Sequence, residues 1–176
     1  MIIVLYNHSV REGNIMGKYF YSALDIARYV INYSNGRNYG ITNLKLQKVL
    51  YFIQARFLVE GEPCFFEKIE AWDYGPVVRD VYQEFKYYGG CNIPNQLEYE
   101  EFDENTWRLH SVKFNEEIID QSDRKVINEI VDELSDLSAN DLVMITHNQA
   151  PWKNAYKKNE NNVIENDSIK NYFLNR

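Results

Sequence analysis

Residues 41–63, ITNLKLQKVLYFIQARFLVEGEP, constrain the fold more than any other stretch because they predict one long helix with both ends marked. Thr42 is a favourable N-cap, since its hydroxyl can accept a hydrogen bond from a first-turn amide. Gly61 supplies the left-handed residue that often ends helices, and Pro63 prevents the helix from resuming. The helix between these caps is about 18 residues and roughly 27 Å long, about the width of a small domain.

Apolar residues occupy both sides of this predicted helix. A helix that is apolar on both sides has no face for water, so we expect it to be internal and its polar residues to reach a surface or find partners. The two apolar stripes consist of Leu46, Val49, Leu50, Ile53 and Phe57, and of Leu44, Phe52, Ala55 and Val59.

The chain as a whole is predicted to be mainly α-helical, with helices packed around a central buried helix at about residues 43–60 and a small β-hairpin or two-stranded sheet. A short strand ends at Trp72, and residues 106–112 could pair with it. Gly75 and Pro76 predict a helix start, because proline at the first helical position loses no needed amide.

Capping signals mark further helices. Ser22 with Asp25, and Ser138 with Asp141, have the spacing of a capping box. Residues 1–15 carry no convincing period, so we expect a loosely ordered leader there and a single domain over residues 16–176.

Composition excludes several classes of function. The net charge of −7 disfavours a nucleic-acid surface, which needs clustered Lys and Arg. No apolar run reaches the roughly 18 to 20 residues of a membrane span. Cys64 and Cys91 lack CxxC spacing, and the histidines are scattered, so we expect neither a metal site nor a cofactor. A disulfide between the two cysteines stays open, although a reduced cytoplasmic location is the simpler assumption.

Two groups of residues are candidates for binding. Trp72 and Tyr74 could form a rigid recognition corner beside Glu70 and Arg79; alternatively, Trp72 fills the core. In the second group, Lys48 and Tyr51 lie within one helical turn of each other. A buried lysine would need a carboxylate such as Glu70, which would make this group a structural polar network.

His147 with Asp141 or Asp73 raises the possibility of acid and base chemistry. No nucleophile motif, HExxH sequence or glycine-rich phosphate loop accompanies it. A cap or a packed ring is therefore the better interpretation of His147, and no catalytic residue is assigned.

Four short signatures stand in order along the chain: LKLQKVLYF at 44–52, EAWDYGPVVRDVY at 70–82, Thr146-His147, and Pro151-Trp152. Together they resemble the SocA-like Panacea antitoxin domain, and the resemblance runs from about residue 22 to residue 173. It implies a mostly helical domain that acts as the antitoxin of a toxin–antitoxin pair.

The resulting hypothesis is a non-enzymatic, cytoplasmic antitoxin that binds a cognate toxin protein directly. Three alternatives stay open: an adaptor that delivers a bound protein to a cellular protease, a hydrolase that uses His147, and a DNA-binding autorepressor, for which no helix-turn-helix with a basic second helix is apparent. The candidate partner-binding residues are Lys48, Tyr51, Glu70, Trp72, Tyr74, Arg79, Tyr82, His147 and Trp152.

Overall fold

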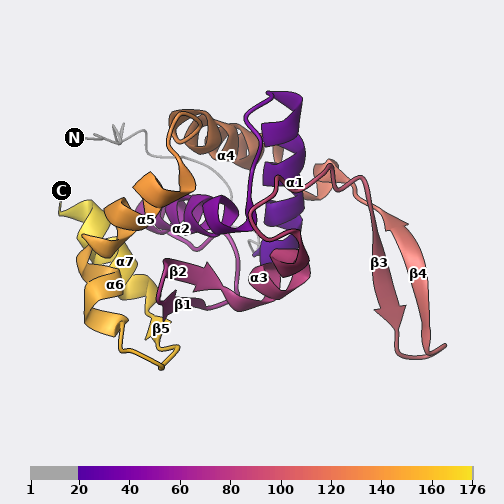
Figure 1. Ribbon diagram of the computed structural model, residues 1–176. Helices are drawn as coiled ribbons and strands as arrows, with labels where there is room; N and C mark the ends of the chain where they lie inside the picture. The colour runs from indigo at the N-terminus through magenta and orange to yellow at the C-terminus, as the bar shows by residue number, and fades with distance from the viewer. Residues whose placement is uncertain (1–19, 176) are drawn as a thin grey trace.

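The computed structural model describes residues 20–175, and these form a mainly helical fold with two small antiparallel sheets (Figure 1). The expected fold class, mainly α with a small sheet, is confirmed at this level. The predicted leader at residues 1–15 lies outside the described residues. The helices are α1 (Ala23–Gly36), α2 (Asn43–Glu60), α3 (Arg79–Phe85), α4 (Gln121–Glu133), α5 (Ala139–His147), α6 (Ala150–Ala155) and α7 (Asn166–Leu174), and two 3-10 turns are η1 (Lys86–Tyr88) and η2 (Glu116–Ile118). The strands are β1 (Ile69–Trp72), β2 (Gly75–Val78), β3 (Glu98–Asp103), β4 (Arg108–Lys113) and β5 (Val163–Ile164).

Helix α2 has the caps that its sequence predicts. The Thr42 hydroxyl oxygen accepts from the Lys45 amide at 3.3 Å, and Gly61 follows the last turn with a φ of 139°. Thirteen of its 18 residues are buried. Helices α1, α4, α5 and α7 and strand β2 all contact it, and Figure 1 shows it between α4 and the β1–β2 pair.

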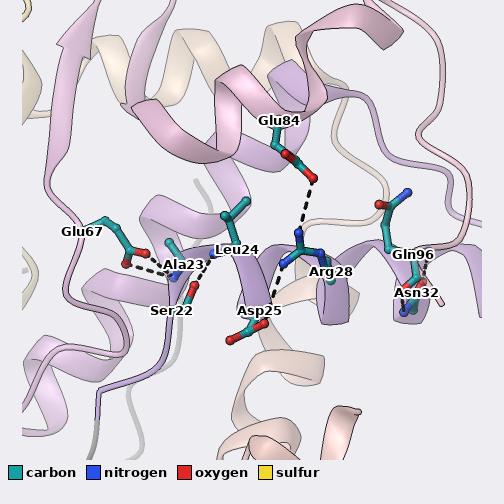
Figure 2. A network of polar contacts seen from close by, with 9 residues as sticks. All are labelled: Ser22, Ala23, Leu24, Asp25, Arg28, Asn32, Glu67, Glu84 and Gln96. Atoms are coloured by element: carbon teal, nitrogen blue, oxygen red, sulfur yellow. Dashed lines mark hydrogen bonds and ion pairs between the residues drawn. The ribbon is translucent and has the colours of Figure 1, made fainter. Parts of the chain in front are cut away.

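The start of α1 differs from the expected capping box. The Ser22 side chain accepts from the Leu24 amide, as an N-cap should, but the Ala23 amide donates to both carboxylate oxygens of Glu67 at 2.9 Å (Figure 2). Asp25 lies 3.8 Å from the Arg28 guanidinium instead of closing the box. A carboxylate from a distant segment therefore satisfies the first-turn amide and ties α1 to the chain before β1.

The predicted helix start at Pro76 is wrong. Gly75 and Pro76 belong to β2, which pairs with β1 so that Trp72 lies opposite Gly75, and the helix begins only at Arg79. The strand order is β2-β1-β5, so β2 is an edge strand. Proline is tolerated on such a strand because its missing amide need not pair with a neighbour.

Residues 106–112 do not pair with the strand that ends at Trp72. They lie in β4 and its preceding turn, and β4 pairs with β3, whereas the second edge of β1 pairs with β5. The reason is local: the Asp103 carboxylate accepts from the Asn105 amide at 2.8 Å, and the Trp107 amide donates to the Asp103 carbonyl at 2.8 Å. This turn folds β3 back on β4, and the hairpin projects from the helical body (Figure 1).

The predicted capping box at the start of α5 is confirmed, and it supplies a stability test. The Ser138 hydroxyl accepts from the Asp141 amide at 3.1 Å, while the Asp141 carboxylate accepts from the Ser138 amide at 3.0 Å. Because Ser138→Ala removes the first of these bonds, we expect it to lower the free energy of unfolding by about 1 kcal/mol in urea titrations. Ser122→Ala, at an exposed position inside the first turn of α4, is the control and should change it by less than about 0.5 kcal/mol.

Candidate partner-binding site

The β1–β2 hairpin carries a cluster of aromatic and charged side chains on its outer side. The Trp72 ring nitrogen donates to the Glu70 carboxylate at 2.7 Å, and Arg79 makes two parallel bonds to the same carboxylate at 3.0 and 2.9 Å. The Arg79 guanidinium also lies 5.9 Å from the centre of the Trp72 ring, and the Tyr82 ring meets Trp72 edge-on at 4.9 Å. Four of the predicted binding residues therefore form one contact cluster.

A groove of about 510 Å³ opens beside this cluster. Tyr74 stands at the turn between β1 and β2, and 69% of its surface is exposed. The groove thus combines aromatic walls with side-chain amides and one lysine. Its lining residues are Asn43, Leu44, Gln47, Trp72, Asp73, Tyr74, Val77, Tyr82, Lys86, Gly89, Asn159 and Asn161.

Lys48 lies directly beneath the hairpin and is fully buried. Its ammonium donates to the Pro76 carbonyl at 2.9 Å, so the expected ion pair with Glu70 is wrong. Glu70 instead pairs with Arg79 and Trp72 on the outer side. Burial lowers the pKa of Lys48 from its ordinary value of 10.5 to about 7, because the charged form loses its hydration there.

Glycine is required at position 75, the first residue of β2, where the hairpin packs against α2 and α5. Its φ is +99°, and a Cβ placed there would lie 2.9 Å from both Lys48 Cε and the Thr146 hydroxyl. The Thr146 hydroxyl itself donates within its helix, to the Leu142 carbonyl at 2.9 Å. The hairpin, α2 and α5 therefore meet at a point where a larger residue has no room.

Three stacked rings support the other side of the hairpin. Trp152 lies between His147, whose ring centre is 3.9 Å away, and Tyr156, whose ring centre is 4.5 Å away. The Trp152 ring nitrogen donates to the Trp72 carbonyl at 3.0 Å, and the Tyr156 hydroxyl donates to the Asp73 carboxylate at 2.8 Å. The stack therefore holds Trp72 and Asp73, where β1 ends and the turn begins.

His147 is a packed ring in this stack. Burial lowers its pKa below the ordinary value, the Lys48 charge lowers it further, and a hydrogen bond with the Asp73 backbone acts in the opposite direction. Its Nε2 atom is buried and makes no hydrogen bond within the described residues. The lowered pKa favours the neutral form of the ring, which packs against Trp152.

Tyr51 reaches the same region from α2 by a different route. Its hydroxyl donates to the Gln149 side-chain oxygen at 2.7 Å, and both groups are buried. Lys48 and Tyr51 thus anchor different segments, β2 and the α5–α6 connection, to the same helix. The Gln47 side-chain oxygen adds a third tie by accepting from the Val78 amide at 2.9 Å.

The nine predicted residues therefore divide by their place in the fold. Glu70, Trp72, Tyr74, Arg79 and Tyr82 make up the outer cluster and the groove wall, and the remaining four lie beneath or behind the hairpin. The sequence did not predict the asparagines that line the groove. It also did not predict the hydrogen bonds by which Gln149 binds Tyr51 and Tyr156 binds Asp73. The spacing of Tyr156 four residues after Trp152, one helical turn, was the available signal for that pair.

The four sequence signatures thus converge on one corner of the structure. The family model described as "Antitoxin SocA-like, Panacea domain" matches residues 46–153, which include the β1–β2 hairpin and most of the four signatures. The chain belongs to this family. A similar protein is the antitoxin SocA of Caulobacter vibrioides (strain NA1000 / CB15N), which is 31% identical over 129 residues.

The match to SocA covers 72% of this Panacea-domain chain and 66% of the relative, so it spans just under two thirds of the relative's length. No solved structure matches. Over residues 20–175, the helices include none long and apolar enough to cross a membrane, and no group of three or more His, Cys, Asp or Glu side chains could hold a metal ion.

Proposed function

We propose that this Panacea-domain protein is the antitoxin of a toxin–antitoxin pair and neutralises its cognate toxin in the cytoplasm by direct protein–protein binding. The observation that carries the proposal is the convergence of the family signatures on the β1–β2 corner, whose outer side has an exposed aromatic groove. In this proposal the toxin contacts the outer cluster and Tyr74. Lys48, Tyr51, His147 and Trp152 keep the corner in place beneath it.

The composition of the corner favours a protein partner. Tryptophan, tyrosine and arginine are the residues that most often dominate the energy of protein interfaces, and all three stand together here. The bonds of Glu70 to Trp72 and Arg79 hold two of these side chains in place before binding. Such preorganisation reduces the side-chain entropy that association would otherwise lose. The net charge of −7 favours rapid encounter with a basic partner.

Co-expression with the protein encoded by the adjacent gene tests the proposal. We expect growth arrest by that protein alone, growth when both are produced, and recovery of a complex of the two by affinity capture. The absence of both a complex and rescue would overturn the proposal. The half-life of the captured protein, measured with and without this chain, distinguishes occlusion from delivery to a protease.

Tyr74→Ala tests the groove itself. Tyr74 is largely exposed, so we expect the free energy of unfolding to change by less than about 0.5 kcal/mol. Loss of an interface tyrosine should nevertheless weaken toxin binding by about tenfold or more, measured by calorimetry with an inactivated toxin. Phe66→Ala is the matched control, because Phe66 is 66% exposed and lies before the opposite end of β1. Equal affinities for the two variants would place the interface elsewhere.

A further inference from the structure

The β3–β4 hairpin contributes little to the core and projects from the helical body (Figure 1). We call residues 97–114 the β3–β4 arm. Of the twelve strand residues, only Tyr99, Asp103 and Val112 are even partly buried. A two-stranded hairpin exposed on both faces and both edges is marginal by itself in water, so its presence calls for an explanation other than packing.

The free end of the arm carries an exposed apolar patch. Phe102 and Leu109 lie opposite each other across the two strands and therefore on one face, and the Trp107 ring meets Phe102 edge-on at 5.7 Å. We call these three residues the tip triad. Their exposed fractions are 49% for Phe102, 60% for Leu109 and 80% for Trp107. A contiguous apolar patch at the end of a projecting element is typical of an interaction site.

The backbone at Trp107 strengthens this interpretation. Its φ is +54°, in the left-handed region where glycine and asparagine are at ease and a bulky aromatic residue is an outlier. The turn alone would thus be more stable with another residue. Its ring packs against Phe102 in the open and fills no space in the core, so folding does not account for a tryptophan at this position.

The base of the arm is fixed to α1, which gives the tip a defined position. The Arg28 guanidinium lies 3.6 Å from the centre of the Tyr99 ring and is held between Asp25 and Glu84 (Figure 2). Asn32 exchanges two hydrogen bonds with the backbone of Gln96, at 3.1 and 2.6 Å. The arm is therefore a preorganised extension of the helical body.

The charge of the arm selects the kind of partner. Residues 97–114 hold five carboxylates against two permanent cations, and Glu100 and Glu104 stand near the tip triad in sequence. A second copy of this chain, with its own net charge of −7, would meet the arm with like charge, and so would nucleic acid or an anionic membrane. A basic protein with an apolar recess complements both features.

We propose that the β3–β4 arm is a docking element for a basic protein, with the tip triad entering an apolar recess of that protein and the arm's carboxylates pairing with its Lys and Arg side chains. This inference rests on the proposed antitoxin function, in which the basic protein is the toxin. It adds a second contact surface, on a part of the molecule that the β1–β2 groove does not include.

Trp107→Asn gives the sharpest test, because asparagine tolerates the left-handed backbone and the variant should fold at least as well as the wild type. With the inactivated adjacent-gene product as the probe, we expect at least tenfold weaker binding for Trp107→Asn and unchanged binding for the Phe66→Asn control. The double variant Glu100→Lys/Glu104→Lys should slow association at least fivefold at low salt and reduce its dependence on ionic strength.

The outcomes separate the two proposals. If the wild type fails to bind and fails to rescue growth, the antitoxin function falls and the docking arm falls with it. If the wild type binds and the arm variants bind equally well, only the docking arm is overturned. A change in sedimentation or in binding to neutral phosphatidylcholine vesicles, with toxin affinity intact, would also overturn it in favour of self-association or membrane contact.

Discussion

Gly75→Ala is expected to lower the free energy of unfolding by about 4 kcal/mol. Two costs combine. The backbone at φ +99° is strained for any residue with a Cβ, and the new carbon would lie 2.9 Å from Lys48 Cε and from the Thr146 hydroxyl. Urea titration followed by circular dichroism measures the loss.

The β1–β2 hairpin should also be displaced in this variant. Because Gly75 lies directly opposite Trp72 in the hairpin, a displaced β2 would move the outer cluster, and toxin binding should fall even at temperatures where the protein stays folded. Gly90→Ala is the control: no atom lies within 4 Å of the added carbon, and its φ is not left-handed. A Gly75→Ala protein within about 1 kcal/mol of the wild type would contradict the close approach described here.

Lys48→Met is expected to raise the free energy of unfolding at pH 7 by about 2 kcal/mol. Burial of the ammonium lowers its pKa to about 7, compared with 10.5 in the unfolded chain. Each unit of this difference corresponds to about 1.4 kcal/mol of penalty on the charged form. Methionine removes that penalty but leaves the Pro76 carbonyl without its donor, which offsets about 1 to 3 kcal/mol of the gain.

The change of stability with pH shows which charge state of Lys48 the folded protein disfavours. Between pH 7 and 10.5 the unfolded chain binds more protons at Lys48 than the folded protein does, so wild-type stability should rise with pH across this window. Below pH 7 both states are charged at this position and the full penalty remains. Chemical denaturation from pH 7 to 9.5 should therefore show a rise of up to about 3 kcal/mol for the wild type that is absent in Lys48→Met.

Lys68→Met, at an exposed position, controls for the loss of one charge. Unchanged toxin affinity in Lys48→Met would support a purely structural role for the buried amine. Weaker binding without lower stability would instead assign Lys48 to the interface and contradict the role given to it here. Measurements stop near pH 9.5 because burial raises the pKa of Tyr21 and Tyr29, so tyrosine ionisation favours the unfolded chain at higher pH.

The sequence predicted the elements whose ends and faces are set locally. Thr42 and Gly61 marked α2 correctly because capping depends on neighbours a few residues away, and the Ser138–Asp141 box was found for the same reason. Pro76 did not distinguish a helix start from a strand, because the same residue type begins helices and occupies edge strands. The outcome here was set by the pairing of β2 with β1, in which Pro76 lies opposite Ala71.

The candidate site was only partly predictable. The outer residues Glu70, Trp72 and Arg79 are close in sequence, so their grouping followed from one strand and one turn. The partner of Lys48 could not be predicted, because a backbone carbonyl leaves no mark in the sequence and a nearby carboxylate is the usual expectation for a buried amine. The β3–β4 arm was missed as a separate element because its acidic strand lacks the alternation of a half-buried one.

The groove takes its walls from α2, from the hairpin and η1, and from residues 159–161, which follow Tyr82 by almost half of the chain. At roughly 5 to 20 residues per second on the ribosome, the interval between the synthesis of Tyr82 and that of Asn161 is about 4 to 16 s. During that time the growing chain contains α2, the β1–β2 hairpin and η1 but lacks the wall of the groove that Asn159 and Asn161 form. Only a chain synthesised past Asn161 can present the complete groove, so the appearance of binding-competent protein should lag behind initiation of its translation by at least this delay.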